Sequence, residues 1–393
     1  MSRPILVTSA LPNANGAPHF GHLVGAYLPA DVYVRYQRLL GADVAFICGT
    51  DEHGVAITMG AEQAGVPYKD YVDKWHKVWL DSCEDLAIHF DNFSQTSRQD
   101  PHYPLSQEFF LRLLKNGRLQ RRDIKQLYSP KTNRFLADRY VVGTCYICGH
   151  DKARGDECPQ CGSWLETTRL IDPKSRQDPD DKLELRESWQ YELDLAPFHE
   201  DPHVKPWLDE FRTHLKTNVS KFVFEKMIEG EGLEARPITR DLPWGVPLPQ
   251  TDLDGNDLGD VSEKVLYVWF DAPIGYISST IEWCREHGGD WRRFWIRKQG
   301  EEGSRLIHFI GKDNISFHCI VFPAMLAWQT LDAPPAGLTG PGAGEEYVLP
   351  ENVPANEFFN YEGRKFNKSE GWTIDVHDFL QKYGPDRTRF YLL

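Results

Sequence analysis

The chain of 393 residues is 41% apolar and 26% charged, the balance of an ordinary globular protein with two or three domains. Its formal net charge of −14 excludes a protein that binds nucleic acid over its whole surface, so the basic stretch Lys115–Lys125 is either a local basic face or a solvated helix end and loop. No apolar run approaches the ~20 residues that span a bilayer, and Met1–Thr8 enters a strand-like run directly. We therefore expect a cytosolic protein with no membrane partner.

The first part of the chain predicts a strand, a helix and a second strand. Residues 5–8 form a short run of β-forming apolar side chains, and a loop rich in proline and glycine follows. Apolar residues then recur at helical spacing from about residue 21 until Gly41, a natural helix end. The run Asp43–Cys48 predicts a buried strand, which a right-handed crossover places parallel to the first. The helix face expected to be buried consists of Leu23, Tyr27, Ala30, Val34 and Leu39.

The second part of the chain repeats this order. Val265–Phe270 predicts a buried strand followed by a helix near residues 275–285. Leu306–Ile310 predicts another strand, followed by a helix over about Phe317–Trp328. Two such halves separated by a long segment predict an α/β fold, with a Rossmann-type doubly wound parallel sheet split by an inserted connective domain.

The predicted domains follow from these elements. The catalytic domain would comprise residues 1–118 and 238–330, with the connective insertion at residues 119–237. Residues 331–393 would contain a surface excursion rich in proline and glycine at Ala333–Ala343 and a cationic loop near the end.

Four cysteines lie close together in the insertion, with the spacing Cys145-x2-Cys148-x9-Cys158-x2-Cys161. Two Cys-x2-Cys pairs in a cytosolic chain are typical of a structural zinc ion held by four thiolates, so residues 143–163 are predicted to form a zinc knuckle. Disulfides or four unrelated cysteines are the alternatives, and the nearby His150 is a substitute ligand that four cysteines do not need.

Three further motifs have the chemistry of a phosphate and amino-acid site. Pro18–His22 opens the first helix, where free N–H groups suit phosphate, Gly21 admits a flat base, and His19 and His22 can donate hydrogen bonds. Gly49–Gly54 follows the second strand at the same sheet edge and offers Asp51 to an ammonium group. Lys365–Ser369 is a cationic loop suited to a triphosphate. Taken singly, each motif is also explained by helix capping or by a solvated turn.

The order of these motifs resembles a class I aminoacyl-tRNA synthetase of the methionyl type. Longer blocks extend the resemblance to essentially the whole chain: Ile238–Pro247, Tyr267–Tyr276, Phe309–Asn314 with Phe317 and His318, and Arg389–Leu393. The resemblance implies ATP-dependent activation of an amino acid, expected to be L-methionine, to an aminoacyl-adenylate, and its transfer to the end of a tRNA. It also implies Mg²⁺ held by the phosphates, one structural Zn²⁺ per chain, and the start of a stem-contact region within residues 331–393.

The resemblance assigns roles to individual residues. The catalytic residues would be His19, His22, Lys365 and Lys368. ATP would be bound by His19, Gly21, His22, Asp313, Lys365, Lys368 and Ser369. The amino acid would be bound by Leu11, Asn13, Asp51, Trp269, Pro273, Tyr276 and His318, with Asp51 on its ammonium group. A flexible thioether suits such an aromatic pocket through dispersion and sulfur–aromatic contacts.

Some positions depart from the pattern of the family. Asn13 stands where the family usually has tyrosine against the methionine side chain, so a smaller polar group opens or wets the pocket and leaves amino-acid specificity open. In the cationic loop, Asn367 replaces the usual serine and Glu370 a common basic residue. Because Lys368 is retained, we expect activity with altered loop closure.

The length of the chain leaves two functions open. Members of this family continue into a helical domain that reads the anticodon, and only its entrance is present here. The chain is therefore expected to be either a catalytic fragment that charges tRNA or a short paralogue that activates methionine, or another amino acid, for a different acceptor. A non-catalytic regulatory protein is disfavoured because His19, His22, Asp51 and Lys368 are all retained.

The change Lys368→Ala is expected to lower the rate of amino-acid activation far more than it weakens ATP binding. The charge that this lysine would neutralise develops on the departing pyrophosphate, in the transition state rather than in bound ATP. Pyrophosphate-exchange rates and the dissociation constant of ATP, measured on both proteins, check this. Equal losses in the two quantities would contradict the role.

Overall fold

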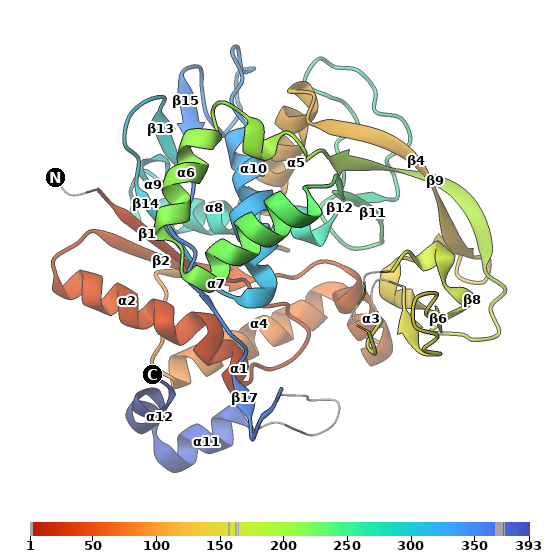
Figure 1. The fold of residues 1–393 in the computed structure, drawn as a ribbon, viewed down its shortest axis with the longest axis horizontal. Helices are drawn as coiled ribbons and strands as arrows, with labels where there is room; N and C mark the ends of the chain where they lie inside the picture. The colour runs from red at the N-terminus through yellow and green to blue at the C-terminus, as the bar shows by residue number, and fades with distance from the viewer. Residues whose placement is uncertain (1–2, 156–157, 162, 164, 366–371, 373) are drawn as a thin grey trace.

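The computed structural model describes residues 3–155, 158–161, 163, 165–365, 372 and 374–393. At its centre lies a five-stranded sheet with the order β16-β14-β1-β2-β3, in which every neighbouring pair is parallel (Figure 1). Its strands are β1 (Ile5–Ser9), β2 (Val44–Thr50), β3 (Asn92–Gln95), β14 (Arg305–Gly311) and β16 (Ala355–Asn356). The predicted α/β class with a doubly wound parallel sheet is confirmed.

The two central strands are buried on both faces, which explains their unbroken apolar sequences. Along β1, Leu6 packs into one hydrophobic core, whereas Ile5 and Val7 pack into another. Ala45 and Phe46 of β2 alternate between the same two cores. A sheet of this kind needs helices on each side, and the crossover connections supply them.

The first crossover is one continuous helical segment that changes type along its length. It consists of α1 (Phe20–His22), the π-helical η1 (Leu23–Tyr27) and α2 (Leu28–Leu39). The predicted inward residues are buried as far as Val34, but Leu39 is 86% exposed, so that part of the prediction is wrong. Five residues of α-helix rotate a side chain by about 140°, which carries Leu39 away from the face of Val34.

The predicted strand Val265–Phe270 is mostly wrong. Only β12 (Lys264–Leu266) is a strand, and it pairs with β11 (Thr239–Asp241) outside the central sheet. From Val268 the chain is already the helix α8 (Val268–His287). The deciding pattern is a helical stripe of fully buried side chains, namely Phe270, Ile274, Ile277 and Ile281.

Other elements around the sheet were predicted in part. The strand β14 is confirmed, and the helix after it is present as η7 (Phe317–Val321) and α10 (Phe322–Ala327). The strand β3 was missed because its sequence, Asn-Phe-Ser-Gln, has no apolar run. It lies so close to β2 that a Cβ atom on Gly49 would be 2.5 Å from the backbone oxygen of Ser94. The remaining long helices are α3 (Val55–Ala64), α4 (Tyr68–Asp85) and α5 (Gln99–Lys115), and α4 and α5 pack into different hydrophobic cores.

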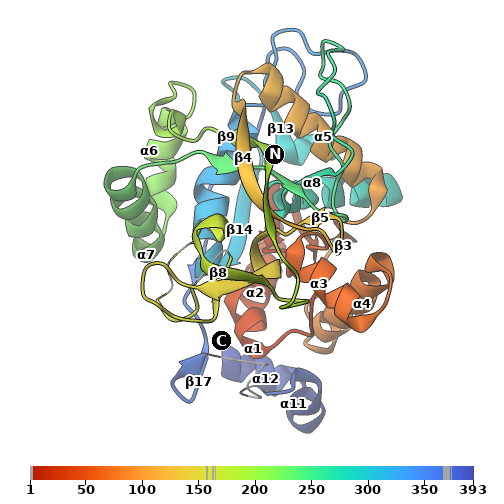
Figure 2. The same ribbon diagram turned by 90° about the vertical axis from the view of Figure 1, so that its right-hand side faces the viewer.

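A long antiparallel ribbon leaves the body of the molecule and carries the cysteine region (Figures 1 and 2). The ribbon consists of β4 (Leu119–Ser129) and β9 (Glu184–Leu193), extended by β5 (Arg134–Phe135) and β10 (Arg236–Pro237). Beyond it, a three-stranded sheet is formed by β6 (Val141–Thr144), β7 (Ala153–Arg154) and β8 (Ile171–Ser175). The chain then returns through α6 (Lys205–His214), α7 (Thr217–Ser220) and the π-helical η5 (Lys221–Glu231).

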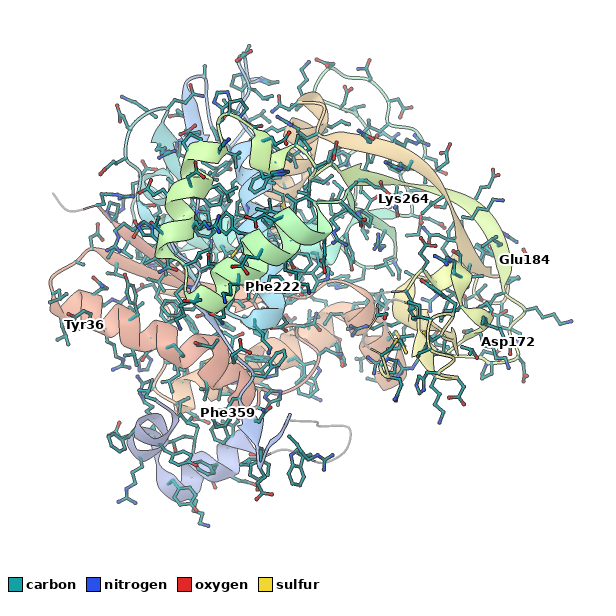
Figure 3. The ribbon with its side chains drawn as sticks, in the orientation of Figure 1. Tyr36, Asp172, Glu184, Phe222, Lys264 and Phe359 are labelled. Carbon is teal, nitrogen blue, oxygen red and sulfur yellow. The ribbon has the colours of Figure 1, made fainter. Side chains whose placement is uncertain are left out.

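The basic stretch Lys115–Lys125 is a strand from Leu119 onward, rather than a helix end and loop throughout. Several of its cations have acidic partners: Lys115 pairs with Asp254, Arg118 with Asp201 and Arg122 with Glu192. At the base of the ribbon, the buried Lys264 donates to the carboxylate of Asp241 at 2.6 Å and to Ser188 Oγ at 2.8 Å (Figure 3). The hydrogen bonds that Lys264 donates to Ser188 Oγ and to the backbone oxygen of Trp189 tie the ribbon strand β9 to the body.

The C-terminal helices pack below the first crossover (Figure 1). They are α11 (Val376–Tyr383) and α12 (Pro385–Leu392), and Phe379 meets Phe20 edge to face at 5.0 Å. Further short elements between α8 and α11 are α9 (Arg292–Trp295), β13 (Ile296–Lys298), β15 (Glu345–Tyr347), β17 (Asn360–Tyr361) and β18 (Arg364–Lys365). Residues 333–343, all of them described, contain no helix or strand, as predicted. In the described part of the chain, no helix is both long and apolar enough to cross a membrane.

Candidate active site

The strand order reverses between β1 and β14, and the loops that leave these strands therefore diverge at the carboxyl edge of the sheet. The loop after β1 runs beside the loop after β2. The N–H of Asp51 donates to the oxygen of Pro12 at 2.9 Å, and the N–H of Ala14 donates to the oxygen of Asp51 at 2.8 Å. This pairing places Asn13 beside Asp51, and the Asn13 side-chain amide donates to Asp51 Oδ2 at 3.3 Å.

The carboxyl group of Asp51 has an unusual electrostatic environment. Burial, and next the nearby carboxylate of Asp271, raise its pKa to about 8. The Asn13 amide and the backbone N–H of His53, which is 3.4 Å from Asp51 Oδ1, act in the opposite direction. Near neutral pH this group is therefore largely protonated, and a cation brought to it would favour its ionised form.

The carboxyl side chain of the next residue, Glu52, is buried and holds this loop. It accepts hydrogen bonds from Thr50 Oγ1 at 2.7 Å, from Gln95 Nε2 at 3.0 Å and from Ser97. The helix α3 (Val55–Ala64) has Gly54 as its N-cap residue and no side-chain cap, so helix capping does not explain the two acidic residues of this described loop.

His19 and His22 form a capping box at the start of α1. Each Nδ1 accepts the backbone N–H of the other residue, at 3.2 and 3.3 Å, and the two rings stack at 3.7 Å with an interplanar angle of 17°. The capping explanation is therefore correct, yet it does not exclude a second role. With Nδ1 as acceptor, we assign the proton of each neutral ring to Nε2, which makes Nε2 a hydrogen-bond donor. Gly21 lies between the two histidines in the sequence and is half-buried.

A neutral polar pair lies at the buried end of the predicted amino-acid pocket. Tyr276 Oη is 2.8 Å from His318 Nε2, and His318 Nδ1 is 3.1 Å from the oxygen of Asn314. The contact from Asn314 is its backbone carbonyl oxygen, which can only accept a hydrogen bond. We therefore assign the His318 proton to Nδ1, so the Tyr276 hydroxyl donates to Nε2. Burial lowers the pKa of His318 to about 4 and raises the pKa of Tyr276 well above its usual value. Both side chains are therefore uncharged at neutral pH.

Apolar and aromatic side chains adjoin this pair. Trp269 stacks on Phe317 at 3.9 Å, with an interplanar angle of 11°, and is 36% exposed. Leu11 packs so closely on the helix α8 that a Cβ atom on Gly275 would be 2.9 Å from Leu11 Cδ2. Pro273 is buried within α8, between Trp269 and Tyr276.

The other residues predicted to bind the nucleotide come after the strand β14 in the chain. Asp313 follows β14 in the short helix η6 (Lys312–Asn314), and its Oδ1 would be 2.7 Å from a Cβ atom on Gly311. Lys365 belongs to β18, and its side chain is not among those described. Lys368 and Ser369 lie outside the described residues. The roles assigned to all four residues remain predictions.

A buried cluster behind Asp51 was missed by the sequence analysis. Asp271 Oδ2 is 2.5 Å from His53 Nδ1 and 3.5 Å from His102 Nε2, and all three side chains are buried. Two ligands of one metal ion lie about 3 Å apart or more, so the 2.5 Å contact is a hydrogen bond and not shared coordination. The available signal was an aspartate inside the apolar run Tyr267–Tyr276, although nothing in the sequence identified its partner.

The four clustered cysteines fit a tetrahedral metal ion. Their Sγ atoms all lie within 4.8 Å of one another, and those of Cys148 and Cys158 are 3.6 Å apart. Zinc–sulfur bonds of about 2.3 Å give sulfur–sulfur distances of about 3.8 Å in a tetrahedron. The backbone N–H groups of Ile147 and Cys148 point at Cys145 Sγ, at 3.4 and 3.5 Å, as is expected around a thiolate. All eight cysteines of the chain are free thiols, and His150 is outside the cluster.

The cysteine region is docked onto the helix that follows Asp51. Tyr140 Oη donates to Thr58 Oγ1 of α3 at 2.7 Å, and Arg134 forms an ion pair with Glu62 at 2.6 Å. One hydrophobic cluster contains Val55 and Met59 of α3 together with Cys145 and Cys158. The order of the cysteine region therefore affects the helix that begins directly after the candidate site.

Comparison with known proteins shows similarity along almost the whole chain. Residues 5–393 match the family model described as "tRNA synthetases class I (M)". The methionine–tRNA ligase of Protochlamydia amoebophila is 44% identical over 393 residues, which is 99% of this chain and 51% of that protein. The methionine–tRNA ligase of Rubrobacter xylanophilus is 44% identical over 402 residues, covering 100% of this chain and 64% of that protein. The chain therefore spans about half to two thirds of the length of these relatives.

The fold has a counterpart among solved structures. The structure of Mycobacterium tuberculosis methionyl-tRNA synthetase in complex with methionyl-adenylate superposes with a TM-score of 0.70 at 25% sequence identity. The match covers 100% of this chain and 64% of that one. The fold of this chain is thus shared with that enzyme.

Proposed function

Since the chain belongs to the family of class I tRNA synthetases (M), we propose that it activates L-methionine with ATP to methionyl-adenylate and transfers the methionyl group to a tRNA. The observation that carries this proposal is that the Asp51 carboxyl, paired with Asn13, lies near enough to the neutral Tyr276–His318 pair to act on the pKa of Tyr276. The methionine–tRNA ligases of similar sequence and the synthetase that binds methionyl-adenylate support it.

The activation step requires no covalent bond to the protein. The carboxylate of the amino acid attacks the α-phosphorus of ATP; a new oxygen–phosphorus bond forms, the bond to the β-phosphate bridge breaks, and pyrophosphate leaves. Asp51, ionised by the arriving ammonium group, holds the amino acid in place for this attack. His19 and His22 donate through Nε2 to phosphate oxygens, where negative charge builds.

The loop near the C-terminus and the cofactors complete the proposed site. Lys365 and Lys368 neutralise the departing pyrophosphate, and Ser369 and Asp313 contribute to the nucleotide end of the crevice. Mg²⁺, bound mainly by the phosphates, supplies charge neutralisation there. Zn²⁺, bound by Cys145, Cys148, Cys158 and Cys161, is structural and keeps the cysteine region folded against α3.

The pocket is suited to a thioether because it presents no charge to the amino-acid side chain. The hydroxyl of Tyr276 and the neutral ring of His318 are polar enough to contact sulfur, while Leu11, Trp269 and Pro273 provide apolar surface. Asn13 takes the place of an aromatic residue in this family pattern and instead donates to Asp51. The side of the pocket near Asn13 is therefore more polar than in a typical member.

The acceptor is the second part of the proposal. A tRNA acceptor end is expected from the relatives, which are methionine–tRNA ligases, and the cytosol is the compartment that this function implies. Asn13 is the specific observation that favours the other candidate, a methionyl-type paralogue that activates methionine or another amino acid for a different acceptor.

Amino-acid-dependent ATP–pyrophosphate exchange, measured with each standard amino acid, tests the proposed function. L-Methionine is expected to drive exchange better than any other, and at least about a hundredfold better than amino acids with charged side chains, which the neutral pocket rejects. Subsequent charging of methionine tRNA separates the two acceptors. Exchange driven by a different amino acid would overturn the methionine assignment, and exchange without tRNA charging would favour the paralogue.

The affinity for L-methionine is expected to increase with pH. The pKa of about 8 for Asp51 in the empty site means that below pH 8 binding requires loss of its proton. The dissociation constant should therefore fall by about tenfold per pH unit well below pH 8 and level off above it. Calorimetric titration from pH 6 to 9 checks this, with 4-(methylthio)butanoate, which lacks the amino group, as the control ligand. A methionine profile as flat as that of the control, or an unchanged slope in Asp51→Asn, would contradict the role.

Metal analysis is expected to find one zinc ion per chain. Cys145→Ser should lose the metal and lower the melting temperature by several degrees, since the thiolates order the region that packs on α3. Hydrogen exchange in residues 55–64 should accelerate at the same time. Cys284→Ser, a cysteine outside the cluster, is the matched control and should retain the zinc. A folded protein without zinc would refute the site.

A further inference from the structure

The cluster of Asp271, His53 and His102 joins three parts of the molecule. Asp271 lies in the first turn of α8, His53 in the loop after β2, and His102 in α5. The outer nitrogens of the two rings are also held: His53 Nε2 is 3.3 Å from Tyr103 Oη, and His102 Nδ1 is 3.0 Å from Ser278 Oγ. These contacts determine the orientation of both imidazoles.

The ionisable groups of this cluster are shielded from solvent, so they interact mainly with one another. Asp271 Oδ1 is buried and has no hydrogen-bond partner among the described residues. The carboxylate raises the pKa of His53 against the effect of burial, so Asp271 and His53 form a buried ion pair, while burial lowers the pKa of His102. Removal of one member would leave the other charge buried without a counterion, which is costly.

The ion pair directly adjoins Asp51. The backbone N–H of His53 points at Asp51 Oδ1 at 3.4 Å, and Gly54 packs against Val268 of α8, where a Cβ atom would be 3.2 Å from the Val268 side chain. Trp244 Nε1 also donates to the oxygen of Glu52 at 2.6 Å. The loop after β2 is thus held by Val268 of α8 on one side of the ion pair and by Trp244 on the other.

Other ionisable groups face the cluster from each neighbouring element. Asp51 and Glu52 face it from the loop after β2, Tyr103 from α5 and Glu282 from α8. Beyond Tyr103 and Trp244 lies a cavity of about 520 Å³ that Lys69 and Arg98 also line. Lys69 pairs with Asp73 and Arg98 with Glu282, so their charges are already matched. Among these groups, Asp271 is the charged neighbour that acts most strongly on Asp51, after burial itself.

We infer that Asp271 and His53 are positioning residues for the amino group of the amino-acid substrate. Their buried ion pair holds residues 51–54 on α8 so that the Asp51 carboxylate faces the crevice. This inference rests on the proposed function, because it assumes that Asp51 binds the substrate ammonium group. Neither residue touches the substrate, so both act through Asp51.

The inference predicts an effect confined to ligands with an amino group. In Asp271→Asn, the dissociation constant of L-methionine at pH 9 should increase about tenfold, while that of 4-(methylthio)butanoate and the KM for ATP should stay within twofold. His53→Gln should show the same selectivity, and the double variant should lose no more than either single variant because the pair acts as a unit. The pH at which methionine binding levels off should fall in Asp271→Asn, since the carboxylate that opposes ionisation of Asp51 is gone.

Glu108→Gln is the matched control. Glu108 is a buried carboxylate paired with Arg112 at 2.7 Å on α5, away from the crevice, so its change carries a comparable cost in stability without a link to Asp51. It should leave both ligands and the pH profile unchanged. Melting temperatures of all variants, measured alongside, identify losses that come from unfolding.

The outcomes separate the inference from the proposed function. If the wild type binds and exchanges L-methionine, but Asp271→Asn weakens both ligands equally or neither, the inference is overturned and the function stands. Selective weakening of L-methionine with a downward shift of the pH profile supports both. A wild type that shows no methionine-dependent exchange overturns the proposed function and this inference with it.

Discussion

The reversal of strand order between β1 and β14 is the constraint on which the rest of the structure depends. At this point the connections after the two strands turn to opposite faces of the sheet, so no backbone covers the edge between them. The loop that contains His19 and His22, the loop that contains Asp51, and the helix that contains His318 all meet at that edge. Each comes from a different part of the chain, and only the parallel sheet brings them together.

The charge of the site follows from its burial. A carboxyl group that is partly removed from water and lies near a second carboxylate favours its protonated form until a cation arrives. The neighbouring Tyr276 and His318 are kept neutral by burial as well. The candidate site therefore suits a ligand with an ammonium group and an uncharged side chain, as the proposed function requires.

The sequence predicted the parts of the fold whose pattern is unambiguous. Strands β1 and β2 are apolar on both faces, and along the chain they come directly before and after a long helix. Their pairing therefore followed from chain order alone. The segment Val265–Phe270 was mistaken for a strand because a short apolar run looks the same in a strand and in the first turn of a buried helix. The four residues of β3, Asn-Phe-Ser-Gln, have no apolar run that would predict a strand. Their place in the sheet depends on the close contact with Gly49 of β2.

The candidate site was predictable to a similar extent. Motifs identified His19, His22 and Asp51, because each stands beside a strand or helix end where ligands bind. The ion pair of His53 and Asp271 was not predictable, since its members are 218 positions apart in the sequence and only the tertiary fold brings them together. The hydrogen bond from Asn13 to Asp51 likewise depends on two loops running side by side.

The way in which the ribbon is attached has a consequence for how such chains diverge. Leu119, the first residue of β4, pairs directly with Leu193, the last residue of β9, so the inserted segment leaves and re-enters the body at one point. Both ends are fixed there in the shared core, and Lys264 additionally holds β9 through Ser188 and Trp189. Residues can be gained, lost or exchanged in the exposed parts of the ribbon without altering the path of the chain through the sheet. The part that contacts α3 is less free to change, because Tyr140, Arg134 and the cluster around Cys145 and Cys158 hold the helix that follows Asp51.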